Sequence, residues 1–193
     1  MWRKTLLVLV SLTAACSGRV SEPSGLSDPV GPVTFKLRNT TQADVYVRWQ
    51  QTAPIYDINQ AGKHLDTLHW CTPLCEESCA CVDCAPMPDE VLKLAAGETY
   101  SFTWTGTWYE PRSCSGGCSC DETRATLAGS YQITVAGARA FKASGAATPG
   151  PGTKPGVTTN AEPDLSKGAC QSQRTVSLVV GAQTVDLDIS CDK

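Results

Sequence analysis

The sequence lacks the motifs that mark most enzymes and nucleic-acid-binding proteins. It contains no G-x-S-x-G nucleophile turn, no P-loop, no H-E-x-x-H zinc motif and no glycine-rich dinucleotide turn. Lysine and arginine number 16 against 19 acidic residues, so a net charge of -3 offers no basic surface for nucleic acid. Only two histidines are present, which leaves few candidates for acid–base chemistry. We therefore expect a non-catalytic protein without a cofactor or a nucleic-acid partner.

Long hydrophobic runs are also missing. The chain begins with Met1-Trp2-Arg3-Lys4, and an uncharged stretch then runs from Thr5 to Ala15. This stretch is shorter than the roughly 20 apolar residues that a transmembrane helix needs. A basic start, a short apolar run and small residues at its end are typical of a secretory signal peptide. We expect residues 1–15 to direct export and then to be removed.

The end of this leader, Leu12-Thr13-Ala14-Ala15-Cys16, resembles the lipobox of bacterial lipoproteins, although Thr13 stands where that family most often has leucine. The resemblance implies that Cys16 carries acyl chains, becomes the new N-terminus and anchors the protein to a membrane. Ser17, in place of aspartate, resembles the outer-membrane address of Gram-negative lipoproteins. Residues 16–32 would then be the lipidated cysteine and a flexible tether rich in Ser, Gly and Pro. The alternative is ordinary signal-peptide cleavage, which leaves Cys16 as a free thiol.

Cysteine is in clear excess, with 11 among 193 residues. Assigning Cys16 to the anchor leaves ten, which can close five disulfides in an oxidising compartment. The spacing C-x3-C-x-C occurs twice, from Cys75 to Cys81 and from Cys114 to Cys120. The cysteines expected in disulfides are Cys71, Cys75, Cys79, Cys81, Cys84, Cys114, Cys118, Cys120, Cys170 and Cys191. The pairing of the first eight stays open, whereas the last two flank one strand pair and are expected to bond to each other.

Residues 33–193 show the period-2 alternation of β-strands, with short turns between the alternating segments. The predicted fold is all-β, an antiparallel immunoglobulin-like sandwich of about 7–8 strands with disulfide-stapled long loops. The segment 94–104 looks like a hairpin that recurs in bacterial immunoglobulin-like domains. Hairpins are expected for the first two, the third and fourth, and the last two of these strands: 33–38, 45–49, 91–94, 100–105, 131–135, 140–142, 176–180 and 185–189.

Strand direction adds an expectation about where the cysteines lie. If successive strands alternate in direction, the long connections all fall at one end of the domain. All ten body cysteines are then expected at that end, beside the point where the tether enters. Residues 143–169, rich in Pro and Gly without a period, are expected to form a mobile loop. Residues 121–128 are the only segment for which a helix is considered as an alternative to a strand.

The predicted function is that of a lipid-anchored protein of the bacterial cell envelope, in the outer membrane, acting as a non-catalytic binding or structural module. Trp108 and Tyr109 are the candidates for an aromatic surface that binds an envelope protein or a glycan; the alternative is that they cover the core. Two other functions stay open. One is periplasmic zinc or copper binding through the C-x3-C-x-C segments, with His64 and His69 upstream. The other is a small thiol enzyme that uses Cys71 beside His69.

Overall fold

The computed structural model describes residues 29–149 and 156–191. The predicted signal peptide, Cys16 and most of the tether lie outside the described residues. The described chain is nearly all β-structure, with two short 3-10 helices, η1 (Ser115–Gly117) and η2 (Leu165–Lys167). Its strands are β1 (Val30–Asn39), β2 (Val45–Gln50), β3 (Ala53–Pro54), β4 (Asp57–Gln60), β5 (Lys63–Leu65), β6 (Glu90–Leu94), β7 (Thr99–Trp104), β8 (Thr107–Ser113), β9 (Ser119–Ala125), β10 (Gly129–Ala138), β11 (Phe141–Pro149), β12 (Val157–Pro163), β13 (Ala169–Leu178) and β14 (Gly181–Cys191).

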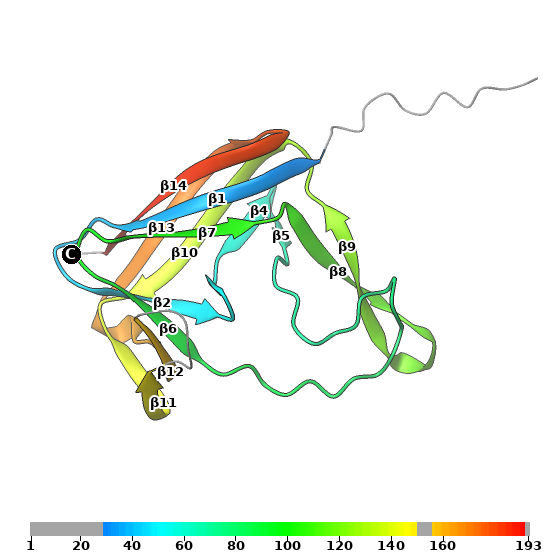
Figure 1. The fold of residues 1–193 in the computed structure, drawn as a ribbon, viewed down its shortest axis with the longest axis horizontal. Coiled ribbons are helices and arrows are strands. Elements are labelled where there is room, and N and C mark those ends of the chain that lie inside the picture. The colour runs from blue at the N-terminus through cyan, green and yellow to red at the C-terminus, as the bar shows by residue number, and fades with distance from the viewer. Residues whose placement is uncertain (1–28, 150–155, 192–193) are drawn as a thin grey trace, which may run out of the picture.

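Twelve of these strands form one mixed sheet whose main path runs β11-β12-β6-β2-β10-β13-β14-β1-β7 (Figure 1). β3 pairs with β2, and β4 pairs with β10 and β5. β8 and β9 form a separate two-stranded hairpin that extends from the body. Among the named strands of the described chain, β1 and β14 pair in parallel and the other pairs are antiparallel. The all-β and mainly antiparallel predictions are confirmed.

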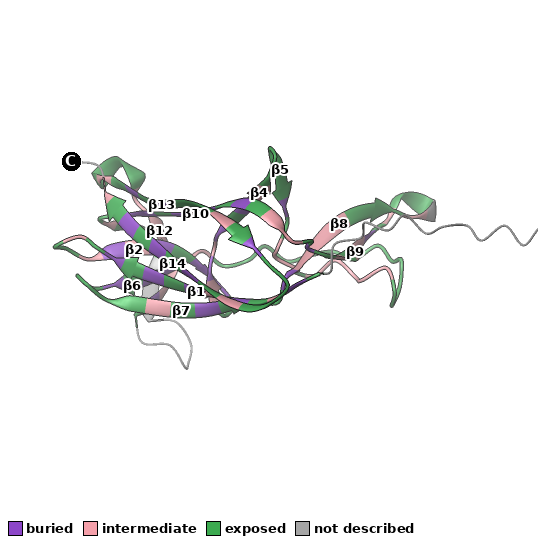
Figure 2. Cartoon of the chain, turned by 90° about the horizontal axis from the view of Figure 1, so that it is seen from above, coloured by how far each residue is buried: buried purple, intermediate pink, exposed green. Residues whose placement is uncertain are grey.

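The sheet folds over one hydrophobic core. β14 pairs with β1 from Gly181 to Ile189 and meets β13 only at its last two residues, in the pairs Gln171–Ser190 and Cys170–Cys191. Inward side chains from the part of the sheet that contains β2 pack against those from the part that contains β7. The rings of Trp49 in β2 and Tyr100 in β7 lie 5.5 Å apart, although these two strands are not hydrogen-bonded neighbours. Figure 2 shows that buried residues concentrate in this body, while β8 and β9 are mostly intermediate or exposed.

The hairpin predictions are wrong for the first two strand pairs. β1 pairs with β14 and β7, whereas β2 pairs with β6, β10 and β3. β6 and β7 likewise lie in different parts of the sheet, and β13 and β14 pair only at their open end. Alternating apolar residues bury one face of a strand in either arrangement, so the period cannot tell a hairpin from two strands that face each other across a core.

The chain bends without reversing between β10 and β11. The ladders β10–β2, β2–β6, β6–β12 and β12–β11 are all antiparallel, so β10 and β11 point the same way. β12 then runs back, and β13 continues in the direction of β12. Because no reversal occurs at residues 139–140, β14 runs parallel to β1 rather than antiparallel to it. The segment 143–169, predicted to be a mobile loop, contains β12 and most of β11.

The expectation that all ten cysteines lie at one end is wrong, because β14 runs parallel to β1. Asn39, the last residue of β1, pairs with Ile189, so Cys191 lies beyond the far end of β1. Ten residues of strand span about 30 Å, which separates Cys170 and Cys191 from the start of β1. The two cysteines do bond to each other. The helix considered at 121–128 is also wrong, because most of that stretch belongs to β9.

Asn39 organises the connections at this far end. Its side chain is fully buried. Nδ2 donates to the carbonyl oxygens of Ala43, Leu94 and Ala95 at 2.8, 2.9 and 3.0 Å. Oδ1 accepts from the backbone N–H of Thr41 at 2.9 Å and from its hydroxyl at 2.8 Å. One side chain thereby holds the connection after β1 against the connection after β6.

We predict that Asn39→Ala lowers the free energy of unfolding by about 3 kcal/mol, because buried carbonyl groups lose their donor. Urea unfolding with the disulfides intact measures the change. Asn59→Ala on half-buried β4 is the matched control and should cost less than about 1 kcal/mol. Equal losses in the two variants would contradict the role given to Asn39.

Candidate functional site

Eight of the ten cysteines lie in a unit that we call the cysteine cap, made of residues 66–89 and the β8–β9 hairpin, residues 107–125 (Figure 1). Residues 66–89 form no named strand and are mostly exposed. Two isolated bridges join this segment to the hairpin, Asp66 with Tyr109 and Leu74 with Asp121. The cap therefore has little apolar burial of its own to stabilise it.

The disulfides of the cap explain the repeated cysteine spacing. Each cysteine of the first C-x3-C-x-C segment bonds to one cysteine of the second, as Cys75–Cys120, Cys79–Cys114 and Cys81–Cys118. The flanking cysteines bond to each other as Cys71–Cys84. Three bonds therefore link the two long connections to each other.

The turn between β8 and β9 positions Cys114 and Cys118. The backbone N–H of Cys114 donates to the carbonyl of Cys118 at 2.9 Å, which closes the turn around η1. Gly116 and Gly117 have φ values of 85° and 81°, a left-handed conformation that glycine adopts without steric cost. The Ser-Gly-Gly sequence between these cysteines therefore permits a turn tight enough to aim both sulfur atoms at the facing segment.

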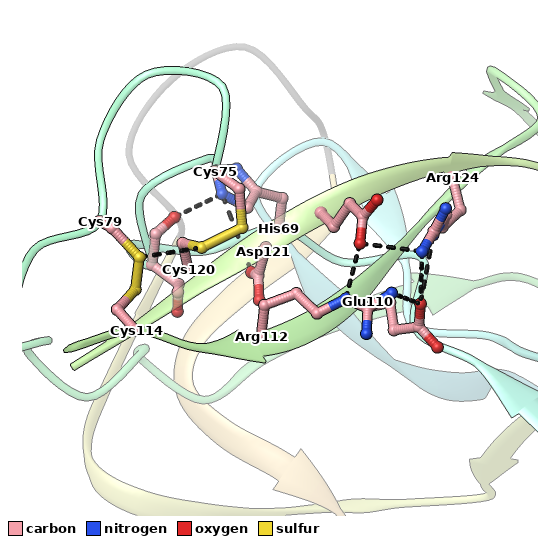
Figure 3. Close-up of a disulfide and its surroundings, with 11 residues drawn as sticks. His69, Cys75, Cys79, Glu110, Arg112, Cys114, Cys120, Asp121 and Arg124 are labelled. Carbon is pink, nitrogen blue, oxygen red and sulfur yellow. Dashed lines mark hydrogen bonds and ion pairs between the residues drawn. A yellow bond between two sulfur atoms is a disulfide. The ribbon is translucent and has the colours of Figure 1, made fainter. Parts of the chain in front are cut away.

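Two of these disulfides lie in contact. Cys79 Sγ is 3.4 Å from Cys120 Sγ, although the two atoms belong to different bonds (Figure 3). The Sγ atoms of Cys79, Cys114 and Cys120 all lie within 4.8 Å of one another. Three sulfur atoms at this spacing could ligate a soft metal ion once reduced, because thiolates rather than disulfides bind metals.

The two histidines occupy different places. His69 lies in the cap, where its Nε2 is 2.6 Å from the carbonyl oxygen of Thr72 and 3.9 Å from Asp121 Oδ2 (Figure 3). His64 lies on β5 with its Nδ1 3.7 Å from Asp57 Oδ1. Cys71, the candidate nucleophile beside His69, is bonded to Cys84.

A charge network covers the hairpin and was missed in the sequence. Glu110 and Glu122 are opposite each other across the two strands, a repulsive pair on its own. Arg112 and Arg124 bridge them, with nitrogen–oxygen distances from 2.6 to 3.1 Å (Figure 3). The hydrogen bond from Arg124 is the main cause of a lowered pKa for Glu110. The repeated E-x-R pattern, at 110–112 and 122–124, was the available signal.

The aromatic candidates Trp108 and Tyr109 are half-buried. Trp108 packs against the hydrophobic core, and the Lys63 ammonium lies 4.2 Å from its ring centroid. Tyr109 faces the ring of His69 at 4.9 Å. Nearby, burial raises the pKa of Tyr56 to about 12, although a hydrogen bond with Thr67 lowers it. Trp108 and Tyr109 thus join the cap to the body and stay partly exposed.

A second polar surface lies on the outer face of β1 and β14. It forms a depression of about 500 Å³ whose lining includes Lys36, Arg38, Arg174, Asp186 and Asp188. Arg38 makes a two-point ion pair with Asp188 at 2.9 and 3.1 Å. Arg174 donates to the backbone carbonyl of Asp186 at 2.5 Å. Because most of these charges satisfy one another, the cysteine cap is the stronger candidate site.

The contact between two disulfides predicts a specific exchange. In Cys114→Ser, the freed Cys79 thiolate can attack Cys120, which forms a Cys79–Cys120 bond and releases Cys75 as a thiolate. Alkylation at pH 8 followed by peptide mass spectrometry should find label on both Cys75 and Cys79.

Cys118→Ser is the matched control for this exchange. It frees Cys81, which is not part of the close sulfur group, and label should stay on Cys81. Label confined to Cys79 in Cys114→Ser would contradict the exchange.

Comparison with known proteins supplies no relative for this arrangement. No known protein family, no characterised protein and no solved structure matches the chain. Within residues 29–149 and 156–191, no helix is long and apolar enough to cross a membrane.

Proposed function

We propose that the chain is an exported protein of the bacterial cell envelope, held in the outer membrane by acyl chains on Cys16 and carrying a non-catalytic binding or structural module. The pairing of ten cysteines into five disulfides carries this proposal. Such dense pairing persists in oxidising compartments outside the cytosol. It leaves one of the 11 cysteines, the one in the lipobox-like segment, for the anchor.

The module is an immunoglobulin-like β-sandwich in this proposal. Two observations support it. Consecutive strands such as β1 and β2, or β6 and β7, pair with different neighbours and pack across the core, as strands that change sheets do. The bond between Cys170 and Cys191 closes the edge where β13 and β14 diverge, so the two parts of the sheet stay joined there.

The cysteine cap is the proposed binding surface. Cross-linked segments lose little conformational freedom when they bind a partner, which favours affinity. The accessible edges of Trp108 and Tyr109, beside the Glu–Arg network, offer aromatic and charged contacts to an envelope protein or a glycan.

Intact-mass spectrometry of the protein purified from membranes tests the anchoring and the oxidation together. We expect a chain that begins at Cys16, carries the mass of its acyl chains and lacks two hydrogens for each of the five disulfides. Cys16→Ala should remove the acyl mass and leave the disulfides. A mature chain with an unmodified Cys16, or one with several free thiols, would contradict the proposal.

Zinc or copper binding is a second candidate, favoured by the close Sγ atoms of Cys79, Cys114 and Cys120. Metal binding requires that the cysteines of the cap are reduced to thiolates. If the protein serves this function, material purified without added oxidant should contain stoichiometric metal and titratable thiols, and Cys79→Ser should lose the metal. We expect the opposite result, no bound metal and no reactive body thiol.

A further inference from the structure

An apolar tip lies where the chain enters the body. Leu127, Val179 and Val180 are exposed to 42%, 53% and 55%. Isolated bridges join Pro29 to Leu127 and Val30 to Val180, so these side chains surround the start of β1. We call Pro29, Val30, Leu127, Val179 and Val180 the uncharged tip. Three large apolar residues are thereby gathered at one small part of the surface.

The chain around the tip carries no charge. Backbone hydrogen bonds from Val30 to Thr126, at 2.7 Å, and from Thr126 to Gly106, at 2.8 Å, bring neighbouring segments together there. The segments that meet there offer no ion-pair partner of their own, although the Lys63 ammonium of β5 lies over Trp108 in one of them. Every residue is uncharged in four segments that meet at this place: 29–35, 99–109, 125–138 and 175–185.

Two glycines let the backbones approach closely beside the tip. A Cβ atom on Gly31 would lie 2.6 Å from the carbonyl carbon of Gly181, and one on Gly106 would lie 2.6 Å from the carbonyl oxygen of Val30. Only glycine fits at these two positions, so the start of β1 packs directly against the segments that carry the exposed valines.

We propose that the uncharged tip docks on the bilayer that holds the anchor, with Leu127, Val179 and Val180 entering the headgroup region. The inference rests on the proposed acylation of Cys16. The chain from Cys16 to Pro29 spans at most about 45 Å, and it reaches the body at this tip. The tip is thus the described part that follows the anchor most closely along the chain. Since it carries no lysine or arginine, docking depends on apolar burial and not on anionic lipid or low salt.

Labelling from within the bilayer tests this docking. The acylated full chain is placed in liposomes of phosphatidylethanolamine and phosphatidylglycerol that contain a diazirine phospholipid, which inserts into contacting side chains after photolysis. Peptides with Leu127 and with Val179 and Val180 should carry the label at low and at high salt. In Val179→Asp/Val180→Asp, label on the Leu127 peptide should fall about tenfold, a change of about 1.4 kcal/mol.

Leu165→Asp is the matched control. Leu165 is 62% exposed on η2, at the far end of the domain, so this variant should keep the labelling of the tip. Equal losses in the two variants would overturn the proposal. So would an acylated protein without label at the tip, a result that leaves the anchor itself intact.

Two further outcomes separate the alternatives. If intact mass shows no acyl chains, the anchoring fails; the same liposomes are then mixed with the unacylated protein, and an unlabelled tip overturns docking as well. If the tip is unlabelled and the protein sediments as a dimer that the double aspartate variant dissociates, the tip binds a second copy and the membrane proposal is wrong.

Discussion

The structure depends most on the three disulfides between the two C-x3-C-x-C segments. A segment as exposed as residues 66–89 cannot bury enough apolar surface to offset the entropy of ordering its backbone. Cross-links that close long loops remove that entropy from the unfolded chain instead. Here the loops are long, since the bonded cysteines are 35 to 45 positions apart in the sequence. The shape of the cap is therefore tied to an oxidising environment in a way that the body is not.

The body is stabilised differently. Its core contains packed aromatic rings, among them Phe35 and Phe102 on the neighbouring strands β1 and β7 and Tyr56 between β3 and β4, with centroids 5.1 to 5.4 Å apart. Asn39 and the bond between Cys170 and Cys191 close its far end. At the near end, Tyr56 and Trp108 connect the core to the cap. Packing, with one disulfide, thus holds the body, whereas four disulfides hold the cap.

The sequence predicted the parts of this structure that are local. Strands at 33–38 and 131–135 follow directly from their alternation, and the bond between Cys170 and Cys191 follows from their symmetric positions about Gly181. The directions of later strands could not be predicted, because one bend at residues 139–140 was taken for a reversal. Strand β9 was missed because Cys120, Asp121 and Glu122 carry no apolar alternation.

Disulfide pairing in the cap lay beyond sequence reasoning for a related reason. The eight clustered cysteines allow 105 pairings. The choice between them depends on the register of β8 against β9, which places Arg112 opposite Cys120 and Ser113 opposite Ser119. That register in turn brings Arg112 and Arg124 between the two glutamates. Slipping the hairpin by one residue would place Glu122 and Arg124 on the opposite face from Glu110 and Arg112 and break the ion pairs between the two strands. The charge network and the disulfides therefore specify the same register, which explains how a two-stranded sheet without a core keeps a single arrangement.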